Sequence, residues 1–249
     1  MDYSLNTLAH TSKITVQMTY SILIINPNSS VNVTNNLKDI LVKPPQVEFE
    51  FYTGPPEAPK EIDGNETSVL SERSVLPDLL KKGDIDRYDG FLVCCYSDHP
   101  LIHSLGKHTD KPILGIMQAT LLYALLNPSV TRLFILTSVN EWEPLLDKAI
   151  TDFVGASEFP SKKFQKTKAL DVSVLSLSDP DEYSKISTRV SDILNKEYAH
   201  DNINCVLLGC AGMAGLDEKL RGSFQNVQFI DSVKVGVEFL TGLIRFHNQ

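Results

Sequence analysis

Short apolar segments rich in β-branched and aromatic residues alternate with longer segments of helical periodicity along the chain. The expected strands are Ser21–Ile25, Val47–Tyr52, Gly90–Cys94, Pro112–Ile116, Thr131–Leu136, Ala169–Leu175, Asn204–Leu208 and Val227–Ile230. The expected helices are Val31–Val42, Glu66–Lys82, Gln118–Leu126, Glu141–Phe153, Asp181–Glu197, Gly215–Arg221 and Ser232–Phe246. Strands separated by helices form βαβ units and a parallel sheet. The pattern therefore predicts an α/β fold whose ligands bind beyond the carboxyl ends of the strands.

The two halves of the chain resemble each other. Ile22–Asn26 and Leu133–Thr137 are both apolar strands that end in a polar residue. Gly90–Cys95 and Asn204–Cys210 are both apolar strands that deliver a cysteine to the carboxyl end. Chance repetition within an α/β protein is the alternative explanation of this similarity. A true repeat would give two similar lobes, each contributing one cysteine to a shared cleft.

The chain carries 23 basic and 31 acidic residues, a net charge of −8 with both signs interleaved. This balance offers no electrostatic footprint for nucleic acid, and no apolar run approaches the ~20 residues that a membrane span needs. Residues 1–20 are polar and lack the apolar stretch of a secretory signal, so we expect a disordered tail. The four cysteines have no CxxC spacing and no histidine cluster, which indicates reduced thiols in the cytoplasm and no metal site.

Cys95 lies at the predicted junction between a strand and a helix, and Ser97 or Asp98 is suited to cap that helix. A thiol close to the positive end of a helix dipole has a lowered pKa, which favours the thiolate. Because neighbouring strand residues point to opposite faces, Cys94 is interpreted as a small buried apolar residue. A buried structural role is the alternative for Cys95 itself.

Cys210 lies in the segment Leu207–Leu216, where three glycines and two alanines leave little bulk over the backbone. Small residues after a strand allow main-chain N–H groups to approach a ligand closely. A tight turn explains the glycines but does not explain a cysteine at its tip. Cys205, inside the same strand, is expected to belong to the core.

Two thiols on opposite sides of one carbon atom perform chemistry that a single thiol does not. A thiolate removes an acidic proton from one face, the other thiol returns a proton to the opposite face, and the pair exchanges roles between enantiomers. The N–H groups after Cys210 are expected to stabilise the enolate formed between these steps. The sequence shows no lysine motif for pyridoxal phosphate, no glycine-rich nucleotide fingerprint and no P-loop, so no cofactor is expected.

The segment Asn26-Pro-Asn-Ser-Ser30 directly follows the first strand. Its amides and hydroxyls are neutral donors and acceptors, which suit a ring of amides better than a pair of free carboxylates. A turn that caps the following helix is the alternative interpretation. Thr137 and Ser138 occupy the corresponding place in the second half.

These segments resemble the aspartate/glutamate/hydantoin racemase superfamily, and within it the branch of hydantoin and allantoin racemases. The similarity is carried by ILIINPNSS, LVCCYSDHPL, PILGIMQA and LLGCAGM, which spread from Ser21 to about Leu243. The resemblance implies two pseudo-symmetric flavodoxin-like lobes, each with a mainly parallel sheet, and an active site in the cleft between them. It implies catalytic roles for Cys95 and Cys210. It also implies substrate contacts by Asn26, Ser97, Thr137 and the backbone of Ala211 and Gly212.

The chain departs from its apparent relatives at several positions. Glutamate racemases carry Asp-Ser after the first strand and a histidine after the second cysteine, whereas this chain has Asn26-Pro27 and Ala211-Gly212. These differences disfavour an amino-acid substrate. Gln118 in place of the usual Glu, and His99-Pro100 in place of Pro-Gly, leave open which ureide is bound. His99 is interpreted as a capping or surface residue, with a general-base role as the alternative.

The leading hypothesis is a cofactor-independent racemase that inverts the C5 stereocentre of a hydantoin-type ureide, either allantoin or a 5-substituted hydantoin. The alternatives are a maleate-type cis–trans isomerase with a cysteine nucleophile and a non-catalytic protein that binds ureides or amino acids. The expected division places residues 21–117 and about 222–249 in one lobe and residues 118–221 in the other. A small-molecule ureide and further copies of the chain are the expected partners.

Overall fold

A computed structural model describes residues 19–82, 85–177 and 180–249. The strands are β1 (Tyr20–Asn26), β2 (Val47–Thr53), β3 (Gly90–Val93), β4 (Ile113–Gly115), β5 (Leu133–Thr137), β6 (Lys168–Ala169), β7 (Cys205–Leu208) and β8 (Gln228–Asp231). The α-helices are α1 (Val31–Ile40), α2 (Asn65–Lys81), α3 (Pro100–Leu105), α4 (Ile116–Leu126), α5 (Trp142–Phe153), α6 (Tyr183–Asp192), α7 (Leu216–Ser223) and α8 (Ser232–His247). Within the described ranges, none of the helices has the length and apolarity that crossing a bilayer requires. Residues 1–18 of the expected tail lie outside the described residues, and Tyr20 already belongs to β1.

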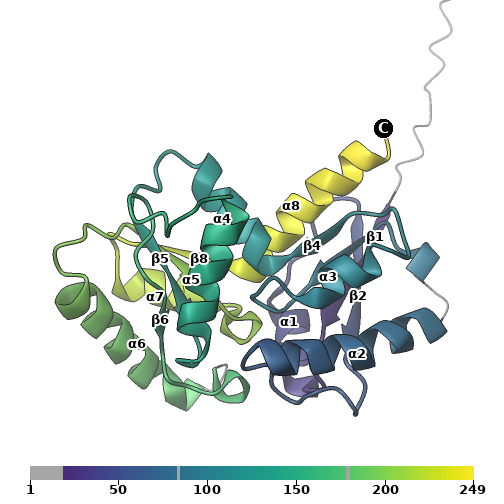
Figure 1. The fold of residues 1–249 in the computed structure, drawn as a ribbon, viewed down its shortest axis with the longest axis horizontal. Helices are drawn as coiled ribbons and strands as arrows, with labels where there is room; N and C mark the ends of the chain where they lie inside the picture. Colours follow the sequence, from purple (N-terminus) through teal and green to yellow (C-terminus); the bar gives the residue numbers. More distant parts are fainter. Residues whose placement is uncertain (1–18, 83–84, 178–179) are drawn as a thin grey trace, which may run out of the picture.

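The strands form two separate four-stranded sheets in which every pairing is parallel. The strand order is β2-β1-β3-β4 in the first sheet and β6-β5-β7-β8 in the second. Each lobe therefore repeats one flavodoxin-like topology, in which β1 corresponds to β5 and β3 to β7. The predicted repeat and the predicted α/β fold are confirmed. Figure 1 shows the two lobes side by side, each with helices around its sheet.

The central strands are buried on both faces, which explains why they appear in the sequence as unbroken apolar runs. Every residue of β3, β5 and β7 is buried. One apolar cluster extends through both lobes, because it contains Ile24 of β1, Leu207 of β7, Cys95 and Ala211. The two sheets thus share part of their core.

Helix α8 connects the lobes. It begins directly after β8 of the second sheet and packs against β3 and β4 of the first sheet and against α4 (Figure 1). Asp231 caps this helix, since its Oδ1 accepts from the backbone N–H groups of Val233 and Lys234. The packing is close: a Cβ added to Gly90 in β3 would lie 2.6 Å from Ile244 Cδ1. A larger residue at position 90 would require the side chain of Ile244 to shift.

The boundary between the two lobes differs from the one expected at about residue 222. β8 pairs with β7, so the second sheet extends to Asp231 and only α8 returns to the first lobe. Helix α4, which was expected in the second lobe, packs against β4 and α8. The alternation of strands and helices predicts which segments form strands, but it carries no information on which sheet an outer strand joins.

The strand expected over Ala169–Leu175 is wrong beyond its first residue. β6 ends at Ala169, and Asp171 adopts a left-handed backbone with φ of 60°, which a strand does not tolerate. Ser173 Oγ then accepts from the N–H of Leu175 and opens a short 3₁₀ helix, η2 (Val174–Ser176). The helix expected over Asp181–Glu197 is α6 followed by a π-helical turn, η4 (Ile193–Glu197).

The docking of α8 predicts unequal effects of two leucines in that helix. Leu240 is fully buried, whereas Leu243 is 44% exposed. We expect Leu240→Ala to lower the free energy of unfolding by about 2–5 kcal/mol, because it leaves a cavity under the helix. Leu243→Ala should change it by less than about 0.5 kcal/mol. Urea denaturation measures both, and equal losses would show that α8 does not dock through its buried face.

Candidate active site

The site lies where the carboxyl ends of the two sheets face each other. In each sheet the chain order reverses between the two central strands, β1 and β3 or β5 and β7, and ligands of open α/β sheets bind at such points. Asn28 and Cys95 follow β1 and β3, while Ser138 and Cys210 follow β5 and β7. All four residues line one cavity. The repeat therefore brings the two cysteines to equivalent positions on opposite sides of one space.

The cavity is narrow and uncharged. It has about 400 Å³ of empty space, but only about 30 Å³ of it admits the centre of a water molecule. None of its lining residues within the described ranges is Lys, Arg, Asp or Glu. The lining consists of Asn28, Val33, Ile62, Cys94, Cys95, Tyr96, Ser138, Trp142, Val174, Gly209, Cys210 and Ala211.

Cys95 is 9% exposed, and its Sγ lies 3.6 Å from Ser97 Oγ. Burial raises the pKa of this thiol to about 11, and the hydrogen bond with Ser97 offsets part of the rise. The lowered pKa expected from a helix dipole is therefore wrong. Helix α3 begins only at Pro100, so its positive end does not compensate for the lost solvent.

Cys210 caps a second 3₁₀ helix, η5 (Ala211–Met213), because its Sγ accepts from the N–H of Gly212 at 3.4 Å. Burial raises the pKa of Cys210 to about 12; the Gly212 N–H lowers it, while nearby Cys95 and Glu61 raise it further. The N–H group of Gly212 was expected to face an enolate, but in this structure it is directed at the sulfur atom.

The other two cysteines have different surroundings. Cys205 is fully buried inside β7, as expected of a core residue. Cys94 was expected to be buried away from the cleft, yet it contributes to the cavity wall, because β3 ends at Val93 and strand alternation stops there. Its Sγ is directed at the carbonyl oxygen of Leu92, 3.8 Å away, and burial raises its pKa.

Asn26 supports the loop after β1 and is absent from the cavity wall. Its fully buried side chain donates to Asn28 Oδ1 and Thr34 Oγ1, and its Oδ1 accepts from the N–H of Asn28. Asn28, which was not among the predicted substrate contacts, lines the cavity instead. Asn28 Oδ1 also accepts from the N–H of Ser30, so both ends of the loop fix its amide. The second asparagine of the Asn26-Pro27-Asn28 segment was the sequence feature from which this residue could have been predicted.

Of the remaining residues that were predicted to contact the substrate, some line the cysteine cavity and others lie behind its wall. Ala211 lines the cavity, whereas Gly212 contributes its N–H group to Cys210. Ser138 takes the place at the wall that was expected for Thr137; Thr137 is fully buried, and no group in the described part of the chain pairs with its hydroxyl. Ser97 contacts Cys95 from the side of a second cavity.

That second cavity is larger and more open, and it lies between α5 on one side and α2, α3 and α4 on the other. Trp142 borders both cavities and separates them. Gln118 belongs to the wall of the second cavity and donates through Nε2 to Asp98. Gln118, which the resemblance suggested as a departure from the usual Glu, thus lies outside the cysteine cavity.

His99 is a capping residue. It is fully buried, its Nδ1 accepts from the N–H of Leu101 at 3.2 Å, and burial lowers its pKa to about 4. It does not line the cysteine cavity. These observations favour the capping interpretation over a general-base role. In the described ranges, no group of three or more histidine, cysteine or acidic side chains is arranged to hold a metal ion.

The sequence matches the Asp/Glu/Hydantoin racemase family over residues 22–240. The chain belongs to this family. Among its relatives, protein DCG1 of Saccharomyces cerevisiae is 31% identical over 244 residues, which cover 92% of this chain and 98% of that protein. A hydantoin racemase of Rhizobium meliloti is 26% identical over 89% of this chain and 87% of its own. Membership of this racemase family identifies the chain as an isomerase.

Solved structures show the same fold. The allantoin racemase of Klebsiella pneumoniae superposes with a TM-score of 0.78 at 23% identity, covering 92% of this chain and 89% of its own. A glutamate racemase of Bacillus anthracis superposes with a TM-score of 0.64 at 13% identity, covering 93% and 83%. The family thus retains the two-lobed architecture although the sequences have diverged widely.

The buried thiols predict a late alkaline titration. Because both pKa values are raised, Cys95 and Cys210 should be protonated at about pH 7 and form thiolates only as the pH approaches about 11 and about 12. Modification of Cys95 by iodoacetamide should accelerate about tenfold per pH unit up to about pH 10, since the thiolate is the nucleophile. Mass spectrometry of the labelled peptide measures the modification rate at each pH. A rate that stops rising near neutral pH would show that burial does not raise the pKa of Cys95.

Proposed function

We propose that this isomerase inverts the C5 stereocentre of a hydantoin-type ureide, either allantoin or a 5-substituted hydantoin, with Cys95 and Cys210 as its acid–base pair. The observation that supports the proposal most directly is the placement of these two cysteines after equivalent strands, on the wall of one cavity. The substrate class agrees with two similar proteins, the hydantoin racemase of Rhizobium meliloti and the allantoin racemase of Klebsiella pneumoniae.

The cavity wall favours an uncharged substrate. An amino acid carries an ammonium and carboxylates, and burying these groups without charged partners costs several kcal/mol. A ureide ring presents amide N–H and carbonyl groups instead. Asn28, Ser138 and the backbone around Cys210 offer neutral donors and acceptors of the kind that such a ring requires.

Few groups at the wall are able to move a proton. Apart from the three cysteines, Tyr96 is the only titratable residue among the lining residues of the described chain, and its hydroxyl pairs with Thr120 Oγ1 at 2.7 Å. Cys94 is directed at a backbone carbonyl, and its pKa is raised by burial. Cys95 and Cys210 are therefore the groups best placed for acid–base catalysis.

The reaction proceeds in two proton transfers. One cysteine, after losing its thiol proton to solvent, acts as a thiolate, takes the C5 proton and becomes a thiol again, while the electron pair of the C–H bond moves to the adjacent carbonyl oxygen as an enolate. The thiol on the opposite face then gives its proton to C5 and becomes the thiolate. The enantiomer is formed, and the two sulfurs have exchanged protonation states, so the reverse reaction uses them in the opposite order.

Asn28 is suited to stabilise the enolate. Its Oδ1 accepts from Asn26 Nδ2 and from the N–H of Ser30, which fixes the amide plane. None of the described residues accepts a hydrogen bond from its Nδ2 in the structure, and the residue borders the cavity. A prealigned neutral donor of this kind stabilises developing negative charge without reorganisation.

Single cysteine variants test the acid–base pair. Cys95→Ala and Cys210→Ala should each lower the rate of inversion of an allantoin or 5-substituted hydantoin enantiomer on the order of a hundredfold or more, because one face loses its acid or base. Cys205→Ala, which removes a thiol from the core of the same lobe, is the control and should retain the rate within about threefold. Polarimetry measures all three. Full racemisation by either site variant would rule out the two-cysteine scheme.

Replacing Asn28 tests the predicted donor. Asn28→Ala should reduce kcat/KM about 10- to 100-fold, the loss expected when one hydrogen bond to a charged group is removed. Asn28→Asp keeps the size but replaces the donor by a carboxylate next to the enolate, so its loss should be larger. If Asn28→Asp were as active as the unchanged protein, no donor from residue 28 would be needed.

A further inference from the structure

Glu61 joins the two lobes at the rim of the cysteine cavity. It lies between β2 and α2 of the first lobe, whereas its partners belong to the second lobe. Its Oε1 accepts from the N–H of Val174 at 2.7 Å, and its Oε2 accepts from Ser173 Oγ at 3.0 Å. Both carboxylate oxygens are thus engaged across the cleft, at the start of η2.

The residues on either side of this contact form part of the cavity wall. Ile62, the neighbour of Glu61 in the chain, lines the cavity from the first lobe, and Val174 lines it from the second. The carboxylate therefore holds together the two wall segments that close the space around Cys95 and Cys210.

The contact extends to the turn that carries Cys210. A Cβ added to Gly212 would lie 2.9 Å from the carbonyl oxygen of Val174, so η2 packs directly on the backbone of η5. The N–H of the same Gly212 donates to Cys210 Sγ. Glu61 fixes the position of η2. Because η2 packs on η5, this position also affects the Gly212 N–H group that donates to Cys210 Sγ.

The cavity is too narrow for a ring as it stands. The space that admits the centre of a water molecule is about 30 Å³, which suffices for a water molecule or two, whereas hydantoin has seven heavy atoms before any substituent. Entry thus requires the wall segments of the two lobes to separate and then return. A hydrogen-bonded carboxylate that joins these segments is placed to govern this movement.

We propose that Glu61 is a positioning residue that clamps the two lobes over the cysteine cavity and sets the turn at Cys210 when the cavity is closed. Its release opens the rim to substrate, and its return excludes water and brings η2 against η5. The identity of the substrate rests on the function proposed above. The clamp itself is tested without any substrate.

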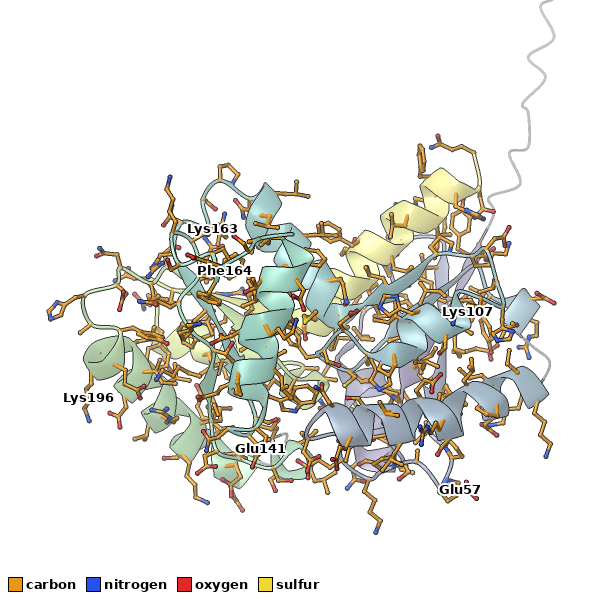
Figure 2. All side chains as sticks on the ribbon, viewed as in Figure 1. Glu57, Lys107, Glu141, Lys163, Phe164 and Lys196 are labelled. Atoms are coloured by element: carbon orange, nitrogen blue, oxygen red, sulfur yellow. The ribbon has the colours of Figure 1, made fainter. Side chains whose placement is uncertain are left out.

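Glu61→Gln removes the negative charge from both hydrogen bonds at nearly unchanged size. Glu57→Gln is the matched control: Glu57 is exposed in the same connection, and within the described chain its carboxylate accepts no hydrogen bond. Figure 2 shows Glu57 at the outer edge of the first lobe, away from the second lobe. Each variant is treated with iodoacetamide, and the rate of labelling is measured for every cysteine by peptide mass mapping.

We expect Glu61→Gln to raise the labelling rates of Cys95 and Cys210 about tenfold, because weaker bonds increase the fraction of open molecules. Cys205 should keep its rate, since local opening does not expose the core of β7, and Glu57→Gln should match the unchanged protein. Unaltered rates at Cys95 and Cys210 would overturn the clamp. An equal rise at Cys205 would also overturn it, because the variant would then act through global unfolding.

Catalysis provides an independent readout. Glu61→Asp keeps the charge, so it should retain more activity than Glu61→Gln or Glu61→Ala. The loss should be greater in kcat than in KM, because closure positions the cysteines. Equal activity of all three variants would argue against a positioning role. If the unchanged protein racemised no ureide at all, the proposed function would fail, while the labelling experiment would still decide whether the clamp exists.

Discussion

The carboxyl edges of two parallel sheets are held facing each other, and the candidate active site depends on this arrangement. Helix α8 starts from the last strand of the second sheet and packs on the first sheet so closely that a Cβ at residue 90 would lie 2.6 Å from Ile244 Cδ1. The apolar cluster shared by both lobes adds to the same restraint. Because each lobe has the same strand order, facing edges place the residues after β3 and β7 opposite one another. The pairing of Cys95 with Cys210 is thus a consequence of topology.

Loss of solvent is the strongest influence on the two thiols. The rise in the pKa of Cys95 from 9.0 to about 11 corresponds to roughly 3 kcal/mol against the thiolate. A helix dipole contributes about 0.3–1 kcal/mol at exposed sites and up to about 2 kcal/mol at partly buried ones, so even a well-placed helix would offset only part of this effect. The narrow cavity therefore favours two neutral thiols. A ring that brings its own amide donors and an acidic C–H bond changes that environment. Asn28 lines the cavity, and the Gly212 N–H donates to Cys210 Sγ, so these groups of the chain are placed to share the charge.

The position of the two cysteines at one cavity could be predicted from the sequence, because both stand where an apolar strand ends and the similarity of the two halves connects them. The sequence predicted the neighbouring contacts less well. Asn26 and Thr137, the last residues of β1 and β5, turn into the protein, and Asn28 and Ser138 just beyond them reach the wall. Side-chain direction at the end of a strand depends on loop geometry, which the order of residues alone does not determine. The contact of Glu61 with η2 was equally unpredictable from the sequence, because 112 residues separate Glu61 from Ser173.

Two sulfur atoms that act on opposite faces of one carbon leave a distinct isotope pattern in the first molecules of product. A single enantiomer of a 5-substituted hydantoin is incubated with the protein in deuterated water and analysed before much of it has reacted. The account predicts deuterium at C5 of the newly formed enantiomer and almost none in the recovered starting material, because the second thiol donates a solvent-derived proton. Product that retains the original hydrogen would show that one base carries the proton from face to face, and would contradict the account.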